Sequence, residues 1–494
     1  MVSYYWQWSD HGPSHLNVVA VFIGIVSGLL AHHGLFVRGN GTFEPPGLFM
    51  TYASLLSGPL WAAGLFSTLS YITSLLVSII TYRIWFHALT RAGFKGPLLR
   101  TSKIWHVWAC RDHTNHLFLD QLNKKYGDFV RTGPSEITIY HPEVFIATDG
   151  PRTTCVKSDW YDLLWPESSL LTTRDRAVYD ARRRDWKLGF SPQGLLDKAI
   201  EADVRAGRPS NMRNYFYWLG FDFMGDFVMS SPLTCSTTTS GTIWSSVCKE
   251  HCHLSMVNPA PWLIQIAFRV APRVYEIGDW FQMTTWTHQQ IRRRLEDGFE
   301  KTGVPDLVHY LLEQKGEPRT TESMLRMRGD SLNAMVAGNE PIPAVLIGNF
   351  SELFSEGLRL YPVLPTGGSR QTVEEGVTIG GVYIPPYTKI VSPRFSIQRR
   401  EDCFEMGNDF VPERWTTHRE MIRNAAAFSP WGESHHSCIA RAMAHDMLRI
   451  VTFQLVKKYR FRMAPDEIPG SAPKDMKDQL APQPGNLSLC FELR

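Results

Sequence analysis

The sequence lacks the cysteine patterns that mark disulfide-rich or zinc-binding modules. Its eight cysteines include no CxxC pair and follow no regular spacing, so we expect a reducing compartment rather than a secreted, cross-linked domain. The tightest group, Cys248-Lys-Glu-His-Cys-His253, has no second ligand pair at zinc-finger spacing. We interpret this group as ordinary helix or loop rather than as a zinc site.

A strong charge imbalance is also missing. The chain has 51 Lys and Arg against 48 Asp and Glu, a formal charge of +3, so nothing calls for a nucleic-acid partner and a small organic substrate is the simpler expectation. No glycine-rich dinucleotide fingerprint follows a predicted strand, so a redox activity would draw its electrons from another protein.

Charged side chains are scarce at the N-terminus. Residues 16–37 form a mostly aliphatic stretch, and from Pro45 to Tyr82 there is no Asp, Glu, Lys, Arg or His. A membrane-spanning helix needs about 20 apolar residues. We therefore expect residues 1–95 to form a membrane anchor of one to three transmembrane helices, with three preferred, at about 16–37, 47–66 and 67–87.

The flanking charges predict the orientation of this anchor. No compact basic region precedes Leu16, and the apolar sequence runs far beyond any cleavage site, which argues against a cleaved signal peptide. A positive cluster follows the anchor, formed by Arg83, Arg91, Lys95, Arg100 and Lys103. By the positive-inside rule, residues 96–494 should face the cytosol. The absence of further apolar spans argues against a transporter.

After Gly96-Pro97 the sequence predicts one large, mainly helical domain with a minor antiparallel sheet. Residues 127–134 and 137–140 have the pattern of paired strands, whereas 214–228 and 279–300 have helical periodicity.

The most informative segment is Ala427-Phe-Ser-Pro-Trp-Gly-Glu-Ser-His-His-Ser-Cys438-Ile-Ala-Arg441, which precedes a predicted amphipathic helix over 442–459. A helix N-terminus favours a cysteine thiolate, and a thiolate can bind haem iron. Taken alone, such a cysteine is more often a simple buried thiol.

Charged motifs upstream change that balance. Glu356-Gly-Leu-Arg359 places opposite charges on one helix face, and Pro412-Glu-Arg-Trp415 supplies a second arginine, Arg414. One carboxylate shared by two guanidiniums can form a buried network that fixes a loop beneath a cofactor.

The order Glu-x-x-Arg, Leu360-Tyr-Pro-Val-Leu-Pro365, Pro-Glu-Arg-Trp and cysteine loop resembles the cytochromes P-450, specifically the microsomal type of fungal secondary metabolism, over roughly residues 95–465. The resemblance implies a mainly α (α+β) cytochrome P-450 fold over 96–494 and a haem b cofactor with Cys438 as its axial iron ligand. It also implies a structural triad of Glu356, Arg359 and Arg414.

Further site residues follow from the same resemblance. Ala337-Gly338-Asn-Glu340 matches the start of the helix that crosses the haem, with Glu340 as the candidate catalytic proton relay. The pocket would be formed around 254–268 and 361–368. Candidate haem contacts are Arg183, Trp186, Arg370, Trp431 and His436, although Arg183 could equally be a solvated or reductase-facing charge.

The implied activity is that of a membrane-bound monooxygenase, an oxidoreductase acting on paired donors with molecular oxygen. It would hydroxylate, epoxidise or desaturate a lipophilic small molecule. Its partners would be membrane lipid and an NADPH-cytochrome P-450 reductase, which alone would carry the NADPH and flavin.

Several positions depart from the family pattern. Around the cysteine, Trp431 replaces Phe, Ser434 and Ala440 replace Gly, and His436 replaces Arg. The near-neutral pKa of histidine would make a propionate contact pH-sensitive. Pro341 replaces the threonine that normally helps to deliver protons, and it would kink the helix.

The largest departure is a length. Ala337-Gly338 and Glu356 are only 18 or 19 residues apart, about 28 Å if fully helical, so most of helices J and J′ would be absent. Two alternatives stay open: a catalytically impaired or silent haem-binding paralogue, and a non-redox haem-thiolate isomerase or dehydratase.

Overall fold

The computed structural model describes residues 15–31, 61–164, 169–186, 203–229, 266, 268–269, 275–297, 306–313, 320–339, 345–346, 354–468, 470–479 and 481–494. The chain divides into two compact units, Met1–Phe94 and Lys95–Arg494. Each unit is described by itself.

The first unit contains two long apolar helices, α1 (His15–Ala31) and α3 (Trp61–Thr81), followed by the short π-helix η2 (Tyr82–Phe86) and the short α4 (Ala88–Arg91). Among the described residues, one helical stretch, Leu65–Arg91, is long and apolar enough to cross a membrane, and α1 contributes the shorter apolar stretch Val18–Leu30. The boundary expected at 66/67 between two spans is wrong, because α3 is continuous from Trp61. Residues 47–60 of the expected second span lie outside the described residues.

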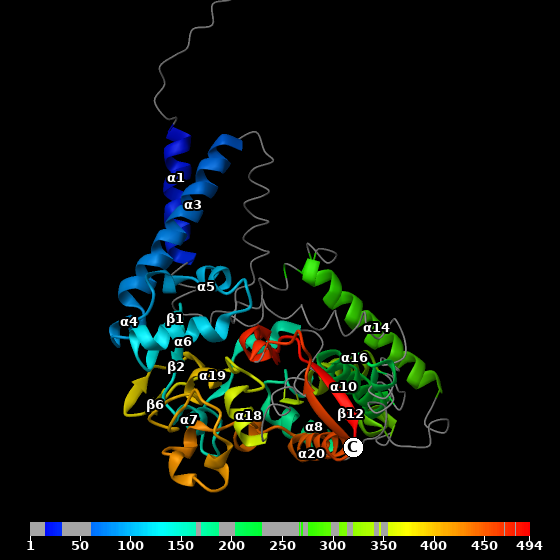
Figure 1. The fold of residues 1–494 in the computed structure, drawn as a ribbon. Helices are drawn as coiled ribbons and strands as arrows, with labels where there is room; N and C mark the ends of the chain where they lie inside the picture. The colour runs from blue at the N-terminus through cyan, green and yellow to red at the C-terminus, as the bar shows by residue number, and fades with distance from the viewer. Residues whose placement is uncertain are drawn as a thin grey trace, which may run out of the picture. The chain divides into compact units, whose positions relative to one another are not determined.

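Two glycines bring α1 against α3, and the helices lie side by side in Figure 1. A Cβ atom at Gly24 would lie 2.3 Å from the Ser67 carbonyl oxygen, and one at Gly28 would meet the Ser74 hydroxyl. Gly–xxx–Gly spacing allows such close approach of helix backbones. Because the later glycine meets the later serine, the two helices run parallel.

The main sheet of the second unit has five strands in the order β1-β2-β8-β5-β3. The paired strands predicted near 127–140 are confirmed as β1 (Phe129–Gly133) and β2 (Glu136–Ile139), which are antiparallel. The sheet is mixed rather than purely antiparallel, because β2 pairs in parallel with β8. The remaining strands of this sheet are β8 (Lys389–Val391), β5 (Ser369–Gln371) and β3 (Val156–Lys157).

The other strands form small sheets. A three-stranded sheet has the order β4-β12-β9, and two hairpins are separate from it. Their bounds are β4 (Ser210–Asn211), β9 (Tyr459–Met463) and β12 (Ser488–Leu493), with β6 (Val377–Ile379) and β7 (Val382–Ile384) in one hairpin and β10 (Lys477–Gln479) and β11 (Ala481–Gln483) in the other.

Helices dominate the second unit, as predicted. Those expected over 214–228, 279–300 and 442–459 are present as α10 (Met212–Met229), α14 (Tyr275–Asp297) and α20 (Arg441–Lys458). The other α-helices are α5 (Ile104–Ala109), α6 (Asn115–Tyr126), α7 (Val144–Asp149), α8 (Arg176–Trp186), α16 (Thr321–Asn339), α18 (Phe354–Leu360), α19 (Arg394–Ile397) and α21 (Ser471–Lys474).

Short 3₁₀ and π segments occur at η3 (Leu98–Thr101), η4 (Asp159–Leu164), η5 (His309–Glu313), η6 (Pro412–Trp415), η7 (Arg419–Met421), η8 (Ala425–Ala427) and η9 (Ser434–His436).

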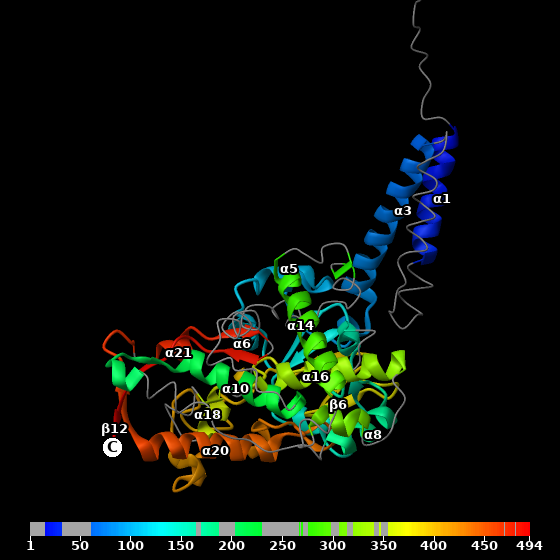
Figure 2. The same cartoon turned by 90° about the vertical axis from the view of Figure 1, so that its right-hand side faces the viewer.

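The principal core lies among α10, α14, α16 and α20, whose apolar faces meet in one cluster that includes Phe216, Ile291, Met335 and Leu448. Figure 2 shows α10 and α16 beside one another above α20. Packing in this core fixes the position of α20, and therefore also the position of the loop that precedes α20.

Candidate functional site

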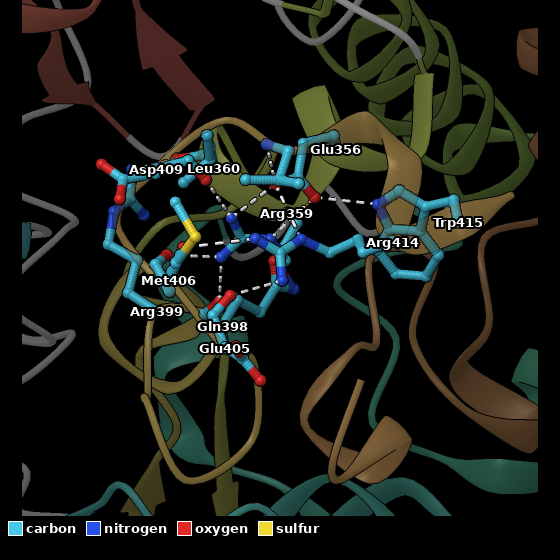
Figure 3. Close-up of polar contacts among 12 residues, drawn as sticks. Glu356, Arg359, Leu360, Gln398, Arg399, Glu405, Met406, Asp409, Arg414 and Trp415 are labelled. Atoms are coloured by element: carbon cyan, nitrogen blue, oxygen red, sulfur yellow. Dashed lines mark hydrogen bonds and ion pairs between the residues drawn. The ribbon is translucent and has the colours of Figure 1, made fainter. Parts of the chain in front are cut away.

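Glu356 is the centre of a fully buried polar network (Figure 3). Its Oε1 atom accepts hydrogen bonds from Arg359 Nη2 at 2.7 Å, Arg414 Nε at 3.0 Å and the Val411 backbone N–H at 3.0 Å. Its Oε2 atom accepts from Arg359 Nε at 2.9 Å and Trp415 Nε1 at 2.8 Å. The structure thus brings the three side chains predicted as a triad into direct contact.

The two arginines use their remaining N–H groups on backbone carbonyls. Arg359 lies one helical turn after Glu356 in α18, which orients its guanidinium fork toward the carboxylate. Their further acceptors are the carbonyl oxygens of Gln398, Gly407 and Asp409 for Arg359, and of Glu405 and Met406 for Arg414. The network therefore fixes the irregular segment 398–411 to α18.

Charge neutralisation dominates at this carboxylate. Burial by itself raises the pKa of Glu356, but hydrogen bonds and attraction from Arg359, with the Val411 and Trp415 donors, hold the pKa below its ordinary value. The carboxylate is therefore ionised, as a buried acid with two cationic partners should be.

Trp415 connects this network to the cysteine loop. While its indole N–H donates to Glu356, its ring lies 4.5 Å, centroid to centroid, from the ring of Phe428. Phe428 lies in the segment that leads to Cys438. The sequence contained Trp415 within a recognised motif, but its hydrogen bond to Glu356 depends on tertiary packing and had no local signal.

Cys438 lies three residues before α20, and its side chain is exposed. The backbone N–H of Cys438 donates to the Trp431 carbonyl at 2.7 Å, which closes the loop between them. A backbone hydrogen bond from Ala440 is directed at the thiol. Backbone groups on both sides therefore hold this exposed residue in the loop.

The thiol has no lowered pKa in the protein alone. Desolvation by surrounding atoms raises the pKa of Cys438, and the Ala440 N–H, Arg183 and Arg441 offset this only in part. The exposed side chain and the desolvation are compatible if the sulfur lies in a recess, accessible from one side only. The backbone N–H of Ala440 thus favours the thiolate, as predicted, while desolvation opposes it.

Backbone geometry explains which glycine replacements the loop tolerates. Ala440 has φ −88° and ψ 9°, which alanine adopts without strain. Ser434 has φ +47°, in the left-handed region that favours glycine. The replacement at 434 is therefore strained, and the one at 440 is not.

His436 lies beside Tyr179 of α8. Its ring is 5.5 Å from that of Tyr179, and its Nδ1 atom is buried with no hydrogen-bond partner among the described residues. Burial, and then the positive charge of Arg370, lower the pKa of His436 to about 4. The ring is neutral near pH 7, which corrects the near-neutral titration expected from the sequence.

Arg183 of α8 is bound to the cysteine loop. Its Nη1 atom donates to the Ser437 carbonyl at 2.9 Å and to the Tyr179 hydroxyl at 2.7 Å. The Tyr179 hydroxyl in turn donates to the His435 carbonyl at 2.9 Å. This fixed position beside the loop distinguishes Arg183 from a freely solvated surface charge.

Arg370, on β5, already has an anionic partner. Its Nε atom donates to Asp149 Oδ1 at 2.6 Å, and its Nη1 atom to the Tyr161 hydroxyl at 2.7 Å. Burial opposes its charge, but Tyr161 and Asp149 raise the pKa of Arg370 above the ordinary value. A propionate at Arg370 would share it with Asp149, an arrangement that the sequence did not indicate.

Two further buried cations near this end of the loop had no sequence signal. Arg394 Nε donates to the Ser429 carbonyl at 3.0 Å, and Lys157 Nζ donates to the Leu171 carbonyl at 2.6 Å. Lys157 also lies 4.5 Å above the Tyr179 ring.

The other predicted site residues are placed as follows. Trp431 packs against the core cluster, with its ring 4.8 Å from that of His445. In α16, Gly338 allows close approach of Met224, whose sulfur would lie 2.1 Å from an added Cβ, and Ala337 is exposed. The Trp186 side chain, Glu340 and Pro341 lie outside the described residues, as do 248–253 and nearly all of 254–268.

These residues fit a haem group. Cys438 offers an accessible sulfur with N–H and cationic neighbours, as an anionic iron ligand requires. The buried, unpartnered His436 Nδ1 and the nearby guanidiniums suit the two carboxylates of the porphyrin, because buried polar atoms need partners. Trp431 adds an aromatic surface on the loop itself.

Comparisons with known proteins agree with this geometry. The cytochrome P450 family profile matches residues 351–491, which include both the Glu356 network and the cysteine loop. The chain is 26% identical to cytochrome P450 monooxygenase FCK2 of Fusarium pseudograminearum, across 95% of this chain and 97% of the relative.

Other relatives agree. The chain is 27% identical to cytochrome P450 monooxygenase phqL of Penicillium fellutanum, across 97% and 96% of the two chains. It is 26% identical to tryprostatin B 6-hydroxylase of Aspergillus fumigatus, across 81% of this chain and 79% of the relative. Residues 351–491 of this chain therefore match the cytochrome P450 family, and the relatives compared across most of the chain are cytochrome P450 monooxygenases.

Proposed function

We propose that this chain binds haem through Cys438 and oxidises a lipophilic small molecule at a membrane, with electrons from an NADPH-dependent reductase. The observation that carries the proposal is an accessible thiol, directly before α20, in a loop tied through Trp415 to the buried Glu356 network. Bound haem supplies the activation of dioxygen, with one oxygen atom going to the substrate and the other to water.

The chain's own residues would hold and orient the group. Cys438 would ligate the iron, Trp431 would cover the ring near the sulfur, and His436 would donate to a propionate from its unpartnered nitrogen. Arg183 would act indirectly, because it fixes the Ser437 carbonyl beside the ligand. Glu340, proposed from the sequence, would relay protons in place of the missing threonine.

We infer that residues 1–95 anchor the enzyme in the membrane of the endoplasmic reticulum through three spans. Because α1 and α3 run parallel, a chain that crosses in both must return between them. Residues 1–14 hold no Lys or Arg, whereas Arg83, Arg91 and Lys95 follow α3. The positive-inside rule then favours a cytosolic position for everything after α3.

The substrate class follows from the relatives and the membrane. Tryprostatin B 6-hydroxylase is named for the hydroxylation of a small molecule, and an anchored enzyme meets lipophilic compounds. We propose a fungal secondary metabolite that is hydroxylated, epoxidised or desaturated, in a pocket bounded partly by residues 361–368.

A second candidate, a haem protein with impaired activity, is favoured by one observation. The alignments with the Fusarium and Penicillium relatives run over 542 and 550 positions, more than the 494 residues of this chain. This chain therefore lacks residues that its relatives have, and we propose that part of the loss falls in the short interval between Gly338 and Glu356. A shortened helix J region would weaken packing under the haem.

Reconstitution with a reductase distinguishes an active monooxygenase from a haem protein with impaired activity. Membranes that contain the full chain and a fungal NADPH-cytochrome P450 reductase should consume NADPH and form oxygenated product from extracts of lipophilic metabolites. The variant Cys438→Ala should form none. Haem binding without any product over a broad substrate panel would support the impaired paralogue instead.

A further inference from the structure

A buried acid in the hairpin β10–β11 has no use in the function described so far. The Asp478 side chain is fully buried, and neither carboxylate oxygen has a hydrogen-bond partner among the described residues. No lysine or arginine forms an ion pair with it in the described part of the chain. An isolated buried carboxylate is costly unless something pairs with it.

The hairpin holds this acid in one direction. The Asp478 backbone N–H donates to the His113 carbonyl at 2.8 Å. Side chains alternate along a strand, so Gln479 and Gln483 lie on the opposite face. There Gln479 contacts His113 Nδ1 at 3.2 Å, and the Tyr217 hydroxyl donates to Gln483. These contacts hold the face of the hairpin that carries Gln479 and Gln483, and Asp478 lies on the opposite face.

The groups that face Asp478 are weak partners. The Thr366 hydroxyl and the His116 backbone N–H lower the pKa of Asp478, although neither makes a hydrogen bond of normal geometry. The His116 ring nitrogen is 3.9 Å from Oδ2, but burial lowers the pKa of His116 to about 4, so the ring is neutral. The neighbouring Cys110 thiol is also neutral, because burial raises its pKa to about 12.

Thr366 links this acid to the proposed substrate pocket. It belongs to the 361–368 segment and lies four residues before Arg370, which lies beside the cysteine loop. The preceding Pro365 accepts from the Phe395 N–H at 2.9 Å, and the Phe395 ring lies 4.7 Å from that of His116. Hairpin, α6, α19 and pocket segment therefore form one packed region.

We propose that Asp478 is a specificity residue that recognises a substrate carrying a basic nitrogen, with the Thr366 segment as the adjoining pocket wall. An ionised carboxylate accepts hydrogen bonds only, and its strongest complement is an ammonium N–H. Such a partner would supply the charge that no described side chain supplies. The proposal rests on the proposed function for its link to oxidation.

Equilibrium dialysis with two matched probes tests it. Tryptamine carries an amine, and 3-ethylindole has a similar body without one. The purified full-length protein should bind tryptamine about ten-fold more tightly than 3-ethylindole, the equivalent of one charge-assisted hydrogen bond. The variant Asp478→Asn should lose this preference and keep its affinity for 3-ethylindole. Direct ligation of the haem iron by the tryptamine amine would contribute equally to binding in the wild type and in Asp478→Asn.

Two further variants serve as controls for this binding experiment. Asp475→Asn removes an exposed acid three residues away and should leave the preference unchanged. Asp478→Glu keeps a carboxylate and should retain much of the preference. The wild-type preference should also grow from pH 6 to 8, because burial raises the pKa of Asp478 to about 7, whereas the amine stays protonated.

Equal preference in the wild type and Asp478→Asn, or a preference independent of pH, overturns the proposal. Dialysis requires no turnover, so this outcome is separate from that of the oxidation assay. A normal thiolate spectrum together with no amine preference would refute only the role of Asp478. Asp478-dependent amine binding without a thiolate spectrum would refute only the monooxygenase function.

Discussion

Replacement of Glu356 by Gln gives the sharpest structural prediction. The carboxylate accepts five hydrogen bonds, three of them from two buried guanidiniums. Glutamine has nearly the same shape but no charge, and its NH₂ group would face N–H donors. Arg359 and Arg414, both 0% exposed, would then be buried cations without a counter-charge.

The magnitude follows from that loss. Removing one partner of a buried ion pair costs about 3–5 kcal/mol, because the other charge stays buried and uncompensated. Domains are typically stable by about 5–15 kcal/mol, so Glu356→Gln should remove a large fraction of the free energy of unfolding. The segment 398–411 should loosen first, since its carbonyls depend on the two arginines.

Urea unfolding of the second unit within the full chain, followed by intrinsic fluorescence, measures this loss. Glu413→Gln is the matched control, because Glu413 lies in the same η6 turn and is exposed. The control should change stability by less than about 0.5 kcal/mol. A loss below about 1 kcal/mol for Glu356→Gln would refute the account of the network.

Three other changes have defined outcomes. Ser434→Gly should raise stability by about 1 kcal/mol in the same unfolding assay, because it relieves φ +47°, whereas Ser437→Gly, at φ −58°, should not. Asp478→Asn should stabilise the protein above pH 7 by up to about 4 kcal/mol and have little effect below pH 4. The sign follows because its folded pKa, about 7, exceeds the unfolded 3.8, so stability is lost as pH rises through 7. A wild-type stability that is flat between pH 5 and 8 would contradict this. In membranes, cysteines placed at Gly28 and Ser74 should cross-link, and cysteines at Gly24 and Ser74 should not; the reverse would mean antiparallel helices.

The sequence was most informative where function depends on spacing along one element. Glu356 and Arg359 are three residues apart, so a single helical turn brings them together. Cys438 precedes a long amphipathic segment, so its position at the start of α20 could be predicted. The strained φ of Ser434 was foreshadowed by the glycine that the family has there.

Tertiary pairing could not be predicted in the same way. Asp149 neutralises Arg370 across 221 residues of sequence, and no local pattern marks that pair. The parallel pairing of β2 with β8 likewise joins strands some 250 residues apart. The pKa of His436 was mispredicted because it depends on burial and on Arg370, which only the folded structure brings together.

The central claim is that Cys438 is the thiolate ligand of a bound haem. Its most direct test is the reduced carbon monoxide difference spectrum of membranes containing the full chain, compared with Cys438→Ser. The wild type should show the long-wavelength band of thiolate-ligated haem, and the variant should lose that band. A thiolate band that persists in Cys438→Ser, or no haem signal from the folded wild type, would contradict the account.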